Sequence, residues 1–170
     1  SYRFHLITTY SMYIATCNNN YSIISECLCK LMEFIKTSPP EDDAAFVINQ
    51  IIDLEQSEIE LSFKDISMLY SFFITCLNDQ TLSSYENYTC VFDNALAAFT
   101  ILIDKYIYEK IPEMHNEAIS NYIYFLPVWE DNPTSDYVYQ FLARLLENQD
   151  PVVMNNDDYL IIAFHNIIAN

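Results

Sequence analysis

Residues 92–106 read FDNALAAFTILIDKY, and the spacing of their side chains sets the fold class. Apolar residues recur after four and then three positions at Phe92, Leu96 and Phe99, which is the period of an α-helix with one buried side. No glycine or proline interrupts the run. The stretch therefore predicts the middle of a helix that extends over about 84–107.

The same helical period continues in both directions, and no strand pattern competes with it. Asparagines and prolines separate the periodic segments. The run Asn18–Asn20 predicts a break, because asparagine tolerates the left-handed conformation that glycine otherwise fills. The expected helices cover about 2–17, 21–37, 41–54, 62–78, 84–107, 112–126, 134–148 and 157–168. The sequence therefore predicts an all-α fold.

The spacing of these helices suggests how they are arranged. Equivalent helices starting near 21, 62, 112 and 157 recur after about 41, 50 and 45 residues, which suits paired-helix repeats of the HEAT or armadillo kind. We therefore expect residues 1–170 to form one HEAT-repeat segment, an α-solenoid of about four antiparallel helix pairs. A closed bundle of eight helices stays open as an alternative, because periodicity does not determine how helices stack.

The composition excludes several classes of function. The 170 residues include 24 acids, seven bases and no glycine. Phosphate loops, dinucleotide fingerprints and nucleophile elbows need glycine, so none is expected. A net charge of −17 repels nucleic acid and makes a basic protein the natural partner. The apolar runs are too short and too polar for membrane insertion.

The nucleophilic and metal-binding residue types form no recognisable set. The five cysteines are expected to be reduced core thiols, and Cys27 and Cys29 lie on different sides of their helix. His5, His115 and His165 are far apart in the sequence, so we expect half-buried packing. No Ser/His/Asp or Cys/His set is apparent, although one assembled only by folding stays open. We therefore predict a protein that is not an enzyme, with no catalytic residue, metal or cofactor.

Three consecutive segments carry a resemblance to a known family. Residues 93–98 read DNALAA, residues 121–131 read NYIYFLPVWED, and residues 139–153 read YQFLARLLENQDPVV. Their order and spacing resemble the importin-β superfamily of nuclear transport receptors, nearest the branch that imports ribosomal proteins and histones. In that branch a D-N-A-x-x-A helix precedes a turn with Trp, Pro, Glu and Asp, and a Y-x-x-L-x-x-L helix follows.

The resemblance implies a function and a set of partners. Receptors of this superfamily (karyopherins) shuttle between cytoplasm and nucleus and perform no chemistry. They bind basic nuclear-localisation segments of protein cargo on a concave face, release them to the GTP form of the small GTPase Ran, and touch nucleoporins on the convex face. The resemblance therefore implies a segment of a nuclear import receptor, found in cytoplasm and nucleus.

The resemblance also suggests which residues contact cargo. The second helix of each pair lines the concave face of such solenoids, here about 41–54, 84–107 and 134–148. Asparagine bonds both groups of an extended peptide, and carboxylates meet its basic side chains. A solvated helix face is the alternative for each position. Apart from Trp129, the candidate protein-binding residues are Glu86, Asp93, Asn94, Asp104, Asp136, Gln140 and Glu147.

Two further features allow a functional and a structural interpretation. Residues 41–60 contain seven acids and no base, which would attract a basic cargo or would simply be a helix start followed by an exposed loop. Trp129 is the sole tryptophan and a candidate contact residue, because tryptophan is enriched at binding hot spots. Packing of the turn between two helices is the alternative for Trp129.

A second family is similar in outline. Poxvirus Bcl-2-like inhibitors are also glycine-poor, rich in tyrosine and isoleucine, and of this length. Such a protein would bind an amphipathic helix in an apolar groove. No segment of this chain matches the death-antagonist core motif, which normally contains Gly-Arg. The transport receptor is therefore the leading expectation, and the helical inhibitor is the alternative.

Overall fold

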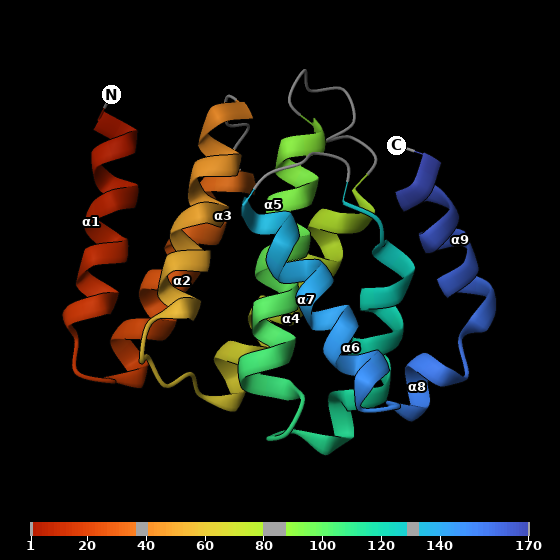
Figure 1. Ribbon diagram of the computed structural model, residues 1–170. Coiled ribbons are helices and arrows are strands. Elements are labelled where there is room, and N and C mark those ends of the chain that lie inside the picture. Colours follow the sequence, from red (N-terminus) through yellow and green to blue (C-terminus); the bar gives the residue numbers. More distant parts are fainter. Residues whose placement is uncertain (1, 37–40, 80–87, 129–132, 170) are drawn as a thin grey trace.

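The computed structural model describes residues 2–36, 41–79, 88–128 and 133–169, and over this part the chain is helical with no strand (Figure 1). The elements are α1 Tyr2–Thr16, α2 Tyr21–Lys36, α3 Glu41–Gln56, α4 Phe63–Asn78, α5 Tyr88–Leu102, the π-helical turn η2 Ile103–Ile107, α6 Pro112–Phe125, α7 Pro133–Glu147, α8 Pro151–Met154 and α9 Asp157–Ala169. The all-α prediction is confirmed.

The expected helix boundaries agree closely with the observed ones. Seven of the eight expected helices begin and end within two residues of the observed positions. The expected helix 84–107 differs, because α5 ends at Leu102 and the chain continues through η2; its first residues lie outside the described ranges. The short helix α8 was not expected.

Alternate helices of the chain lie next to one another. α3 contacts α1 and α5, and α5 contacts α7, while α2 packs on α1, α3 and α4. α6 packs on η2, α8 and α9, so that α1 and α9 form opposite edges of the molecule (Figure 1). Alternating contacts of this kind suit stacked helix pairs. The HEAT-type solenoid itself stays a prediction.

Helix α5 lies at the centre of the packing and is enclosed on all sides. Within residues 91–103 every side chain is buried except Phe92, which is half-buried. α3, α4, α6 and α7 surround the helix. Small residues such as Ala97 and Ala98 let these neighbours approach closely, and a helix that is apolar all round is a buried helix. The expected solvent-facing side of this helix is therefore wrong for residues 91–103.

Other residue types replace glycine where the chain needs a left-handed backbone. Asn18 and Asn19 have φ values of 51° and 58° and end α1, which confirms the prediction for this run. The Asn19 side chain also accepts a hydrogen bond of 3.0 Å from the backbone N–H of Glu60. Gln149 has a φ of 51° and ends α7 in the same way. These positions carry the backbone strain that glycine would avoid.

Residues of η2 donate hydrogen bonds to the last turn of α3 and to the segment that follows it. The ammonium of Lys105 donates to the carbonyl of Glu55 at 2.7 Å and also to the carbonyl of Ser57. The hydroxyl of Tyr106 donates to the carbonyl of Ile59 at 2.9 Å. The last carbonyls of a helix have no partner within the helix, and a cation there also meets the negative end of the helix dipole. η2 therefore fixes the end of α3 against the central helix.

Candidate functional site

A polar pocket lies between η2 and α7. Its volume is about 270 Å³. The residues that line it are Asp104, Tyr108, Glu109, Phe141, Arg144, Leu145 and Asn148. A π-helical turn often marks a functional position, because its extra residue changes the direction of the side chains that follow. This pocket joins two of the expected features, the acidic residue Asp104 and the helix α7.

The carboxylate of Asp104 is already paired inside the protein. Its Oδ2 atom accepts a hydrogen bond of 2.6 Å from the guanidinium of Arg144 and one of 2.5 Å from the hydroxyl of Tyr137. Burial, and then the hydrogen bond to Asp104, raise the pKa of Tyr137 above its usual value, so this phenol stays a donor. The charge of Asp104 is therefore offset by Arg144, and a contact between Asp104 and cargo stays a prediction.

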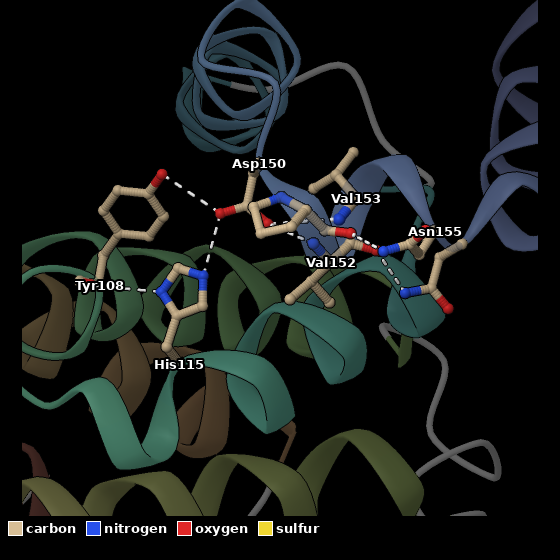
Figure 2. A network of polar contacts seen from close by, with 8 residues as sticks. Tyr108, His115, Asp150, Val152, Val153 and Asn155 are labelled. Carbon is tan, nitrogen blue, oxygen red and sulfur yellow. Dashed lines mark hydrogen bonds and ion pairs between the residues drawn. The ribbon is translucent and has the colours of Figure 1, made fainter.

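A second polar network connects the start of α6 to α8 (Figure 2). Asp150 is only 2 % exposed, and its Oδ2 atom lies 3.0 Å from Nε2 of His115 and 3.3 Å from the hydroxyl of Tyr108. Its Oδ1 atom accepts hydrogen bonds of 3.0 and 3.3 Å from the backbone N–H groups of Val152 and Val153. One carboxylate therefore caps α8 and fastens it to α6.

The ring of His115 is fully occupied by this network. Its Nδ1 atom lies 3.3 Å from the carbonyl oxygen of Tyr108, while Nε2 faces Asp150. Both ring nitrogens therefore have an oxygen partner inside the protein. The geometry gives His115 a structural role.

The three histidines differ in their surroundings. His115 is half-buried, as expected. His5 and His165 are exposed, so the expectation of half-buried packing is wrong for these two. Among the described residues no group of three or more His, Cys, Asp or Glu side chains is placed to hold a metal ion.

The outer side of α7 carries the expected polar residues. Asp136, Gln140 and Glu147 are all exposed, as the spacing of the helix predicted. They lie at steps of four and seven residues, so they follow one side of the helix. Arg144 is exposed on the same helix and turns toward Asp104. Because Arg144 is paired with Asp104, the net charge of this side of α7 comes from the carboxylates of Asp136 and Glu147.

The other expected contact residues are placed differently. Asp93 and Asn94 are buried within α5, where the amide of Asn94 lies 3.5 Å from the Cys90 sulfur. Asp93 lies close enough to Tyr139 of α7 to help raise the pKa of that phenol, after the effect of burial. An exposed position for these two residues was therefore a wrong prediction. Glu86 and Trp129 lie outside the described residues.

Sequence reasoning missed the burial of Glu55. Its side chain is 2 % exposed, and neither carboxylate oxygen has a hydrogen-bond partner among the described residues. A small cavity of about 10 Å³ adjoins it, lined otherwise by apolar residues that include Ile14, Leu28 and Ile51. Burial raises the pKa of Glu55 well above its usual value, and nearby Lys105 offsets this only in part. Thus the acids of residues 41–60 do not all face solvent.

Comparison with known proteins assigns the chain to no family. No protein-family model matches the sequence, and neither a curated protein nor a solved structure matches it. The resemblance to importin-β receptors therefore stays a prediction. Of the helices in the described ranges, none combines the length and the apolar character that crossing a membrane requires.

The Asp150 network leads to a first prediction. Asp150→Ala removes the cap of α8 and the partner of His115, and we expect the free energy of unfolding to fall by about 2 kcal/mol. Asp150→Asn keeps an oxygen for the N–H groups of Val152 and Val153 but loses the charge and the second acceptor oxygen that faces His115 and Tyr108, so it should cost less than Asp150→Ala. Urea unfolding at pH 7 measures both. Equal stability of Asp150→Ala and the unsubstituted protein would contradict the assignment.

The burial of Glu55 leads to a second prediction. The pKa of Glu55 is higher in the folded protein than in the unfolded chain, so folding favours the protonated side chain. The protonated side chain stabilises the fold fully at a pH below the pKa of the unfolded chain, about 4.3. This stabilisation is lost as the pH rises through the pKa of the folded protein. Glu55→Gln cannot ionise. Between pH 5 and pH 8 the stability of Glu55→Gln relative to the unsubstituted protein should therefore rise, by on the order of 1–3 kcal/mol.

Urea unfolding over this pH range tests the prediction about Glu55. Glu147→Gln, at an exposed position at the end of α7, is the matched control, and its relative stability should change far less than that of Glu55→Gln. Parallel curves for the two variants would mean that the Glu55 carboxyl is solvated.

Proposed function

We propose that this chain is a non-catalytic protein-binding segment of a nuclear import receptor, and that it binds basic protein cargo on the exposed acidic side of α7. The observation that carries the proposal is the outer side of α7. Asp136 and Glu147 are exposed there, and within the described part of the chain the one basic residue on this helix, Arg144, pairs with Asp104. Carboxylates at a solvent-facing site pair with lysine and arginine side chains of a peptide.

The charge of the whole chain supports the proposal. With 24 acids against seven bases, the field of the protein attracts a basic partner and speeds its arrival. Gln140 lies between the two carboxylates on α7, and its amide can both donate to and accept from a peptide backbone. The resemblance to importin-β receptors adds Ran in its GTP form and nucleoporins as partners, and a shuttling distribution between cytoplasm and nucleus.

A second candidate function is that of a helical domain that binds an amphipathic helix in an apolar groove, similar to the poxvirus inhibitors. The enclosure of α5 favours it, since a central helix surrounded by others is a feature of closed bundles. A groove of about 410 Å³ near the starts of α4 and α6 would be its site. Leu61, Ile66 and Ile111 give this groove apolar walls.

A binding titration tests the first function against the second. A labelled lysine- and arginine-rich localisation peptide is titrated with the full chain at 50, 150 and 300 mM salt. We expect salt to weaken binding and the double variant Asp136→Asn/Glu147→Gln to weaken it by about tenfold at low salt. The double variant Glu26→Gln/Glu33→Gln on α2 removes the same charge elsewhere and is the control.

Three outcomes of this titration decide the matter. Loss of binding confined to the α7 variant supports the proposal. Equal loss in both double variants would show that only net charge matters and would overturn the assignment to α7. Salt-independent binding of an uncharged amphipathic helix, without binding of the basic peptide, would replace the first function by the second.

A further inference from the structure

Helix α9 is apolar on its outer side as well as on its inner side. Leu160 and Ala163 are buried, and α9 packs on α6 and α8. Ile161 and Ile168, however, are 65 % and 85 % exposed. An exposed helix normally keeps its polar residues on the solvent side, and a helix that is apolar all round is normally covered. The outer side of α9 therefore has the character of a surface that another protein element covers.

The exposed residues of α9 form a continuous band. Ile161, His165 and Ile168 follow one another at steps of four and three residues, and Ile162 lies beside them; all are exposed. The band extends onto α6, because the ring of Tyr159 contacts that of Tyr124 at a centroid distance of 6.0 Å, and both are exposed. We call Tyr124, Tyr159, Ile161, Ile162, His165 and Ile168 the α9 band.

The α9 band lies at the edge of the described structure. Figure 1 shows α9 at the edge of the molecule, with α6 and α8 on its inner side and the opposite edge formed by α1. Apolar residues at steps of three, four and seven on an exposed helix suit a partner helix that packs along it. Scattered exposed apolar residues need no explanation, but exposed apolar residues that follow one side of a helix suit an interaction site.

Charge decides which partner fits. The first turn of α9 contains Asp157 and Asp158, both exposed, and its sequence from Asp157 to Ala169 contains no lysine or arginine. A second copy of this chain would bring a further net charge of −17 and the same two carboxylates. Like charges disfavour that contact, whereas a partner with lysine or arginine beside its apolar stripe would pair with Asp157 and Asp158.

We infer that the α9 band is a docking surface for a basic amphipathic helix of a partner protein. The apolar stripe of the partner covers Ile161, Ile162 and Ile168, and its basic residues lie toward Asp157 and Asp158. This surface is separate from the outer side of α7, so the inference does not depend on the proposed function.

A peptide titration with the full chain tests the inference. The probe is a labelled 18-residue helical peptide with leucines at steps of three and four and lysines elsewhere, followed by fluorescence anisotropy. A matched peptide with glutamate in place of lysine tests the charge, and a scrambled peptide of the same composition tests the stripe. We expect the lysine peptide to bind at least tenfold more tightly than either control peptide at 50 mM salt.

Variants of the protein locate the site. Ile161→Ser removes an apolar contact at an exposed position and should weaken binding of the lysine peptide by about tenfold. Met12→Ser on α1 is the matched control, because Met12 is also 65 % exposed and lies at the opposite edge. Asp158→Asn should weaken binding of the lysine peptide severalfold. The double variant Asp136→Asn/Glu147→Gln on α7 should not change the affinity for this peptide.

The contrary results are equally specific. Equal effects of Ile161→Ser and Met12→Ser would overturn the inference, as would equal binding of the lysine and glutamate peptides. Concentration-dependent dimerisation of the chain in light scattering, abolished by Ile161→Ser, would identify a second copy as the occupant and would also overturn it. Loss of binding in the α7 variant alone would assign the peptide to the surface of the proposed function.

Discussion

The carbonyl groups at the carboxyl end of α3 need hydrogen-bond donors, and the rest of the packing depends on how they are supplied. A helix commonly ends with a glycine in the left-handed conformation, but this chain contains no glycine. The carbonyl of Glu55 in the last turn of α3 instead accepts from Lys105 and Tyr106 of η2, about fifty residues further along the chain. A local problem of helix termination is thus solved by a long-range contact.

The same π-helical turn and the residue after it make further polar contacts with α7 and α8. Asp104 reaches Arg144 and Tyr137 on α7, and Tyr108, directly after η2, reaches Asp150 at the start of α8. Because η2 continues the enclosed helix α5, these contacts are tied to the centre of the apolar core. Residues 104–108 therefore contact the end of α3, the helix α7 and the residue that caps α8.

The sequence predicts the helices well because their buried stripes are long and regular. The prediction of the solvent-facing side fails for α5. Asp93, Ala97 and Ile101 follow one another at steps of four, so the side of α5 that looked polar from Asp93 is apolar further along. The apolar residues on the same side as Asp93 were the feature of the sequence that indicated an enclosed α5. Similarly, Glu55 lies four residues after Ile51, on the buried stripe of α3.

Other features could not be derived from the sequence in physical terms. The π turn adds a residue to one helical turn without a glycine or proline to mark it, and so changes the direction of Asp104 and Lys105. The pairing of His115 with Asp150 joins residues that are 35 positions apart, and only the packing of α6 on α8 brings them together. Periodicity describes each helix alone and carries no information on such contacts.

If Lys105 holds the end of α3, Lys105→Met should have a lower free energy of unfolding than the unsubstituted protein. Lys64→Met, at an exposed position in the first turn of α4, is the matched control. Removing a charged donor from buried carbonyls should lower the free energy of unfolding by about 2 kcal/mol, while the control should change it by less than about 0.5 kcal/mol. Equal stability of the two variants in urea would contradict the account.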